Sequence, residues 1–80
     1  RRIPCSWEDK GTVMRRLSQH YRTQGEEQID GFRISLGEEW VLVLPDPDKP
    51  FISIYAESGT GSQAEELADK YARVVEGFQS

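Results

Sequence analysis

The sequence predicts an α+β domain in which two helices pack on one face of an antiparallel sheet of three or four strands. One apolar stripe at helical spacing closes the chain, and another lies near its start. Three strand-like runs lie between them, and the segments that join these runs are too short for a crossover helix. The expected order is therefore (β)-α-β-β-β-α, with residues 1–80 forming a single domain.

The first helix is expected over residues 7–22. Ser6 is a favourable N-cap, because its hydroxyl can accept a bond from a free backbone N–H of the first turn. The apolar stripe consists of Val13, Met14, Leu17 and Tyr21. An interior glycine costs about 1 kcal/mol relative to alanine. Gly11 therefore leaves open a later start at Thr12.

The first two strands are expected at residues 29–36 and 40–44. In the first, the side chains that share one face are Phe32, Ile34 and Leu36. The second, Trp40–Leu44, is apolar throughout, which also leaves open a sheet covered on both faces. The dipeptide Gly37-Glu38 between them fits a tight hairpin turn.

The third strand is expected at Phe51–Glu57, where Ile52, Ile54 and Ala56 share a face. Residues 45–50 contain three prolines, which cannot donate to a strand ladder, so this segment is a loop. Arg2-Ile3 fits a short edge strand.

The last helix is expected over residues 62–78. Ser62 and Glu65 have the spacing of a capping box, in which each side chain bonds the other residue's backbone N–H. The stripe consists of Ala64, Leu67, Ala68, Tyr71, Val74, Val75 and Phe78. Opposed stripes predict that most of the core is drawn from Trp40, Leu42, Ile52, Ile54, Leu67, Tyr71 and Phe78.

Composition narrows the classes of partner. The net charge is −4, and an acidic body argues against nucleic acid, whose binding depends on neutralising phosphates. The run Trp40–Leu44 is too short to span a bilayer, so no membrane is expected. Cys5 is the only cysteine, which excludes an internal disulfide and favours a cytoplasmic location. The start at Arg1, without a methionine, indicates a piece of a longer protein.

Several residues together resemble the C-terminal domain of the phosphomannomutase and phosphoglucomutase family. They are Ile29-Asp30-Gly31-Phe32-Arg33-Ile34, Trp40–Pro45, Pro50, Ile54-Tyr55-Ala56-Glu57 and the Glu-rich last helix. In the family these positions read I-D-G-x-R, W-x-L-x-R-P, S-G-T-E-P and Y-x-E. The resemblance covers residues 29–78 and implies a domain that contributes a phosphate-binding loop to a sugar-phosphate enzyme.

The loop departs from the family pattern at every polar position. Leu44 stands at the position of the arginine, and Asp46, Pro47 and Asp48 stand at those of S-G-T. Lys49 replaces the glutamate. Two carboxylates repel an incoming anion, and proline has no N–H to donate. We therefore expect this substrate-phosphate position to be degenerate.

A second resemblance covers Pro4–Arg15 and Leu44–Pro50. These residues are similar to a bacterial subgroup in which a nucleotidyltransferase of the mannose-1-phosphate guanylyltransferase type is fused ahead of a mutase-like region. It implies that the main chemistry of the longer protein lies in the nucleotidyltransferase part.

Catalytic and metal-binding motifs are not found in the sequence. The resemblance implies that the phosphoserine, the Mg²⁺ loop and the sugar-recognition segment lie on preceding domains of the same chain. No catalytic residue, metal or cofactor is therefore expected in these residues, and Mg²⁺ and a sugar phosphate are expected in the longer protein. Asp46 and Asp48 alone supply too few oxygens for Ca²⁺. Nothing in the sequence brings Cys5 and His20 together as a nucleophile and its base.

Two further segments have a functional and a plainer reading. The Gly-rich turn at residues 58–62 can offer free amides to an anion, or simply cap the helix that follows. Six of the ten basic residues lie in residues 1–25, which fits a solvated helix face or an interdomain contact. The domain is expected not to be an enzyme alone. It serves either a sugar-phosphate enzyme or a non-catalytic packing, assembly or regulatory role.

Overall fold

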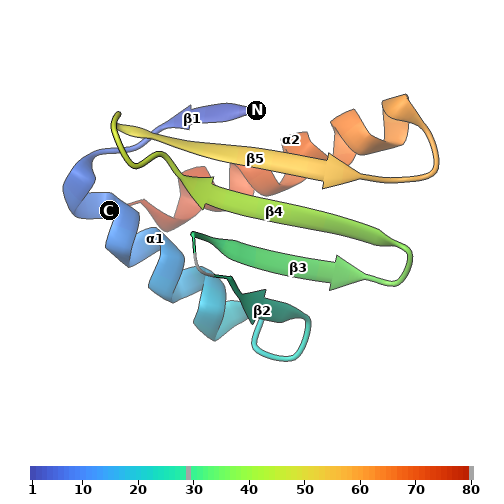
Figure 1. Ribbon diagram of the computed structural model, residues 1–80, viewed down its shortest axis with the longest axis horizontal. Helices are drawn as coiled ribbons and strands as arrows, with labels where there is room; N and C mark the ends of the chain where they lie inside the picture. The colour runs from blue at the N-terminus through green and yellow to red at the C-terminus, as the bar shows by residue number, and fades with distance from the viewer. Residues whose placement is uncertain (29, 80) are drawn as a thin grey trace.

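The computed structural model describes residues 1–28 and 30–79. Its elements follow the order β1 (Arg2–Pro4), α1 (Trp7–His20), β2 (Gly25–Glu27), β3 (Phe32–Leu36), β4 (Glu39–Pro45), β5 (Phe51–Glu57) and α2 (Gly61–Phe78). The strands form one sheet in the order β1-β5-β4-β3-β2, with antiparallel pairing throughout (Figure 1). The predicted α+β class is confirmed.

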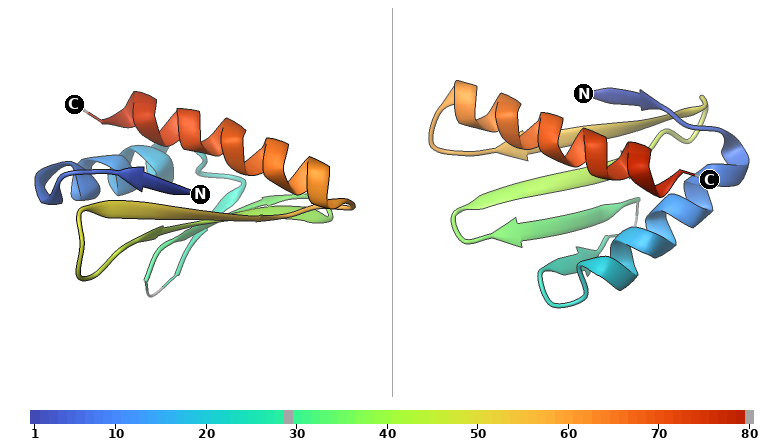
Figure 2. Two further views of the ribbon diagram at one scale, coloured as in Figure 1. Left: turned by 90° about the horizontal axis from the view of Figure 1, so that it is seen from above. Right: turned by 180° about the vertical axis from the view of Figure 1, so that it is seen from behind.

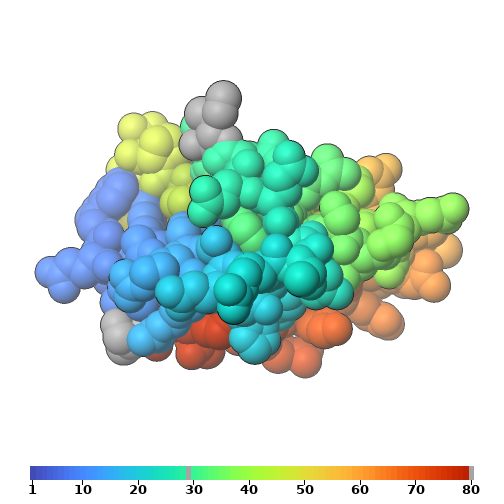
Figure 3. Space-filling view, turned by 90° about the horizontal axis from the view of Figure 1, so that it is seen from below, coloured from blue at the N-terminus to red at the C-terminus, as the bar shows by residue number. Residues whose placement is uncertain are grey.

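Both helices lie on the same side of the sheet, as predicted (Figure 2). α2 packs over β5, β1 and β4, whereas α1 covers β2 and β3. Figure 3 shows α1 lying against the β2 region along one side of the molecule. The opposite face of the sheet carries no helix. Within the part of the chain that the structure describes, neither helix is long and apolar enough to cross a membrane.

The core lies between this sheet and the two helices. Its buried side chains are Ile3, Cys5, Val13, Leu17, Phe32, Ile34, Val41, Val43, Ile52, Ile54, Ala68, Tyr71, Ala72 and Val75. Of the seven core residues predicted from the sequence, Ile52, Ile54 and Tyr71 are buried. Leu67 and Phe78 are partly buried against the core.

Trp40 and Leu42 were wrongly predicted to be core residues. The turn at Gly37-Glu38 is confirmed, and Gly37 adopts φ +70°, a left-handed value that favours glycine. This turn pairs Ile34 with Val41. Directly paired residues of an antiparallel ladder point to the same face, so Val41 faces the helices and its neighbours Trp40 and Leu42 face away from them.

The N-terminal half of the sheet differs from the prediction in two ways. The strand expected at residues 29–36 begins at Phe32, and Ile29 lies outside the described residues. β2 was not expected, because Gly25-Glu26-Glu27 is polar and occupies an exposed edge. The edge strand expected at Arg2-Ile3 is confirmed as β1, which pairs with β5.

The helix boundaries are close to those expected. Ser6 caps α1, with its hydroxyl accepting from the amide of Asp9, and α1 ends at His20 rather than residue 22. The capping box predicted at Ser62 is wrong. The Thr60 hydroxyl accepts from the amide of Gln63 instead, so α2 begins one residue earlier.

Candidate functional site

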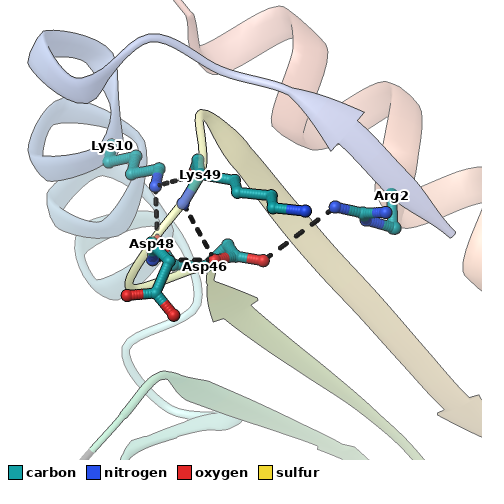
Figure 4. A network of polar contacts seen from close by, with 5 residues as sticks. All are labelled: Arg2, Lys10, Asp46, Asp48 and Lys49. Carbon is teal, nitrogen blue, oxygen red and sulfur yellow. Dashed lines mark hydrogen bonds and ion pairs between the residues drawn. The ribbon is translucent and has the colours of Figure 1, made fainter.

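The loop between β4 and β5 is held closed by its own backbone. The amide of Asp46 donates to the carbonyl of Phe51 over 2.9 Å, and the amide of Phe51 donates to the carbonyl of Lys49 over 2.8 Å. The carboxylate oxygen Oδ1 of Asp46 accepts the amides of Asp48 and Lys49 at 2.8 and 3.0 Å. The amides that point into the loop are therefore bonded to a carboxylate of the same loop (Figure 4).

Lys10 reaches this loop from the first turns of α1. Its side chain is buried, and its ammonium donates to the carbonyls of Asp46 and Lys49, each at 2.5 Å. The ammonium also lies 3.6 Å from the centre of the Trp7 ring, within the range of a cation–π interaction. Two carbonyls and an aromatic face together compensate the burial of this charge.

Sequence reasoning missed this role, because it counted Lys10 among solvated basic residues. One signal was available. Lys10 precedes Val13 by three residues and Leu17 by seven, which places it on the buried stripe of α1. A lysine on the apolar stripe of a helix indicates a buried ammonium that needs acceptors from another element.

Asp46 is the electrostatic centre of the loop. The backbone bond from Asp48 lowers the pKa of Asp46 below its ordinary value of 3.8, and the bond from Lys49 and the charges of Arg2 and Lys10 act in the same direction. The guanidinium of Arg2 lies 4.0 Å from the carboxylate (Figure 4). These bonds and charges favour the charged form of Asp46, and its negative charge occupies the amide-lined centre of the loop.

A cavity of about 580 Å³ opens beside the loop on the helix-free face of the sheet. Among the residues that line it are Leu44, Asp46 and Pro47 of the predicted site, together with Ser53 and Tyr55 of β5. The other two predicted site residues, Asp48 and Lys49, are exposed and do not line it. The structure therefore brings three of the five predicted positions to one cavity.

Two positions of the family-like motifs have structural roles. The indole N–H of Trp40 donates to the carboxylate of Glu57 over 2.7 Å, which ties β4 to β5 at the end of the sheet far from the loop. A Cβ at Gly31 would lie 2.3 Å from the carbonyl oxygen of Val43, a contact that no side chain can make. The backbone at Gly31 thus passes close to the backbone of β4 at Val43.

Cys5 and His20 do not form a catalytic pair. They lie at opposite ends of α1, and 1.5 Å of rise per residue separates them by about 20 Å. Burial raises the pKa of the Cys5 thiol, which disfavours the nucleophilic thiolate. His20 is exposed and makes edge-on ring contacts with Tyr21 and Phe78.

The Gly-rich turn and the basic N-terminal segment both make contacts within the fold. The hydroxyl of Ser58 donates to the carboxylate of Glu39, and the hydroxyl of Thr60 caps α2. Two hydroxyls of the Gly-rich turn therefore bond to other parts of the domain. In the basic segment, Arg1 pairs with Asp69 at 3.3 Å and Arg16 donates to the carbonyl of Phe78 at 2.6 Å. Among the described residues, no group of three or more His, Cys, Asp or Glu side chains is placed to hold a metal ion.

Comparison with known proteins identifies relatives of this chain. It is 33% identical to a protein of Methanopyrus kandleri and 36% identical to one of Pyrococcus furiosus, both named "probable phosphoglucosamine mutase", over 91% and 92% of its length. It is 30% identical to the phosphoglucosamine mutase of Methanocaldococcus jannaschii over 92% of its length. In each case the chain spans only 17% of the relative. No family model and no solved structure matches.

These relatives confirm the coarser part of the predicted resemblance. None of the three names mentions a nucleotidyltransferase, so the predicted fusion stays a prediction. Over about nine tenths of its length, the chain is a homologue of a segment of phosphoglucosamine mutases, which are phosphohexomutases.

Proposed function

We propose that this chain is the C-terminal domain of a sugar-phosphate-processing protein of the phosphomannomutase and phosphoglucomutase type, and that its loop Leu44–Pro50 has lost phosphate binding. The observation that carries the second part is the position of the Asp46 carboxylate. It accepts the amides of Asp48 and Lys49, the donors that a loop of this kind would offer to a phosphate. The domain then contributes its fold and surfaces to the longer protein, while the chemistry lies elsewhere.

The charges around the loop support this assignment. An incoming phosphate meets the carboxylates of Asp46 and Asp48, and a like charge at about 4 Å near a surface is unfavourable by a few kcal/mol at most. The nearest buried cation, Lys10, already donates to two carbonyls. Leu44 has no charge to offer, and Pro47 has no N–H.

The finer parts of the proposal concern the longer protein. We place this domain behind other domains of a cytoplasmic chain that act on a sugar phosphate and hold Mg²⁺. The N-terminal residues Pro4–Arg15 further favour a fusion to a nucleotidyltransferase of the mannose-1-phosphate guanylyltransferase type. Mg²⁺ would polarise phosphate oxygens there, and no residue described in this chain is assigned to it.

A second candidate function is a non-catalytic packing, assembly or regulatory module. The clamp of Lys10 on two loop carbonyls favours it, because a loop tied down at both ends has no freedom to close over a ligand. The two functions differ in whether the loop can regain a ligand when its family residues are restored.

A titration followed by NMR tests the proposal. The unmodified chain and a graft, in which residues 44–49 are replaced by Arg-Pro-Ser-Gly-Thr-Glu, are each titrated with mannose-1-phosphate and glucosamine-6-phosphate. We expect no shifts at residues 44–50 in the unmodified chain at millimolar ligand, and weak saturable shifts in the graft. A saturable response in the unmodified chain would show that the loop is not degenerate. The absence of shifts in the graft would favour the non-catalytic packing, assembly or regulatory module.

A further inference from the structure

β4 is apolar on both of its faces. Val41 and Val43 point to the helices and are fully buried. Trp40, Leu42 and Leu44 point to the opposite face, where no helix lies, and are partly exposed. An antiparallel sheet with one wet face alternates apolar and polar residues, whereas a strand covered on both faces reads as a continuous apolar run. The pattern of β4 is that of a strand covered on both faces.

The side chains around β4 extend this apolar area. We define the outer face by five residues of β4 and β5: Trp40, Leu42, Leu44, Phe51 and Tyr55. The register pairs Leu42 with Tyr55, and 53% of Tyr55 is exposed to solvent. In Figure 1 this face of the sheet is turned toward the viewer.

Two arginines lie on the same side of the sheet as the outer face, because Arg33 pairs with Leu42 and Arg2 pairs with Ser53. The guanidinium of Arg33 lies 4.9 Å from the centre of the Trp40 ring, and that of Arg2 lies 4.4 Å from the centre of the Phe51 ring. Arg33 makes no ion pair with the described residues. An exposed apolar area that contains Trp, Tyr and Phe, with arginines stacked on two of its rings, has the composition of a protein interface.

We propose that the outer face is covered by another part of the same, longer polypeptide, whose contact surface is apolar at its centre and carries a carboxylate opposite Arg33. This inference rests on the proposed function, because it needs a chain longer than the present 80 residues. The relatives have that length, since this chain spans 17% of each. A partner on the same polypeptide is present at an effective concentration of about 1 mM, which favours its binding over that of a second copy of the chain.

Hydroxyl-radical footprinting tests this proposal with a matched pair of reporters inside the domain. Tyr55 and Trp7 are exposed to similar extents, 53% and 55%, but Trp7 lies on α1 rather than on the outer face. The modification rates of both are measured in the 80-residue chain and in the natural protein at its full length. We expect the modification rate of Tyr55 to be at least about fivefold lower in the full-length protein, because interface centres exclude water. The rate of Trp7 is expected to be unchanged.

Two other outcomes overturn the proposal in distinguishable ways. An unchanged Tyr55 rate, or equal slowing of Tyr55 and Trp7, in a natural protein of greater mass than this chain overturns the docking face and leaves the proposed function intact. An intact mass equal to that of the present chain overturns both. Sedimentation of the 80-residue chain is expected to show a monomer. A dimer in which Tyr55 is protected would assign the face to a second copy.

A variant pair separates docking from folding. Leu42→Asp is expected to lower the thermal midpoint of the 80-residue chain by about 4–8 °C, which leaves it folded at room temperature, and to restore the fast Tyr55 rate in the full-length protein. Arg73→Asp, at an exposed position of α2, is expected to leave the Tyr55 rate slow. Equal effects of the two variants on the Tyr55 rate would overturn the proposal.

Discussion

The ammonium of Lys10 and the backbone carbonyl of Asp46 are 2.5 Å apart, which joins the start of α1 to a loop 36 residues further along the chain. The same ammonium bonds the carbonyl of Lys49, so one side chain satisfies two acceptors of the loop. A residue outside the loop therefore stabilises the loop geometry together with the loop's own backbone bonds.

Replacing Lys10 by methionine is expected to lower the free energy of unfolding by about 1–3 kcal/mol, the cost of an unsatisfied buried polar group. Methionine keeps an unbranched stem but leaves the Asp46 carbonyl without its Lys10 donor, whereas the Lys49 carbonyl keeps the amide of Phe51. Urea unfolding followed by circular dichroism measures the change. Lys70→Met, at an exposed position, is the control, with an expected effect within about 0.5 kcal/mol. Equal losses of unfolding free energy in the two variants would contradict a stabilising role for the Lys10 hydrogen bonds to the loop.

A second prediction follows from which side chains of β4 point to the helices. Val41→Ala removes two buried methyl groups and is expected to destabilise the chain by about 2 kcal/mol or more. Leu42→Ala removes more carbon from the outer face but is expected to cost less than about 1 kcal/mol, because that side chain is partly in water already. Both values come from denaturant unfolding of the 80-residue chain. A larger loss at Leu42 would reverse the facing described above.

Gly31→Ala is expected to destabilise the chain or shift its backbone. The new Cβ would lie 2.3 Å from the carbonyl oxygen of Val43, a rigid neighbour that can move only with β4. Gly11→Ala serves as the control, because nothing lies within 4 Å of its Cβ position and helix propensity favours alanine by about 1 kcal/mol. Thermal unfolding should therefore move in opposite directions for the two variants. A stabilising Gly31→Ala would rule out the close approach.

The lowered pKa of Asp46 predicts how the free energy of unfolding depends on pH. Its pKa is lower in the folded state than in the unfolded chain, so the charged loop stabilises the fold above about pH 4 and that contribution is lost as the pH falls through the lowered pKa. In Asp46→Asn the acid-dependent part disappears. The difference in unfolding free energy between the two proteins should thus be constant near neutrality and shrink in acid. A difference that grows in acid would contradict the sign of the pKa shift.

The sequence predicts those elements of the fold whose evidence is local. The stripes of both helices, the Gly37-Glu38 turn and the alternation of Ile52 and Ile54 each lie within a few residues, and each is confirmed. β2 has no apolar residue to mark it, since only its bonds to β3 make it a strand. The cap of α2 was misassigned because Thr60 and Ser62 both offer a hydroxyl, and hydroxyl spacing alone does not choose between them.

The facing of β4 was within reach of the sequence. Phe32 and Ile34 were expected to share one face of their strand, and a two-residue turn pairs them with Val43 and Val41, which must then lie on that same face. The candidate site was less accessible. The positions Leu44–Lys49 follow from the family resemblance, but the bonds of Asp46 to its neighbouring amides and the approach of Lys10 depend on where α1 crosses the end of the sheet.

The three residues of β1 protect the rest of the sheet from other molecules. They occupy the edge of β5, whose segment Ile52–Tyr55 combines two isoleucines with an aromatic ring and carries no charge. Such a segment pairs readily with its own kind when its edge is free. β1 itself is short, ends in Pro4 and carries Arg2, features that discourage further strand addition. Removal of residues 1–4 from the 80-residue chain would thus leave the edge of β5 open to pairing with a strand of another molecule.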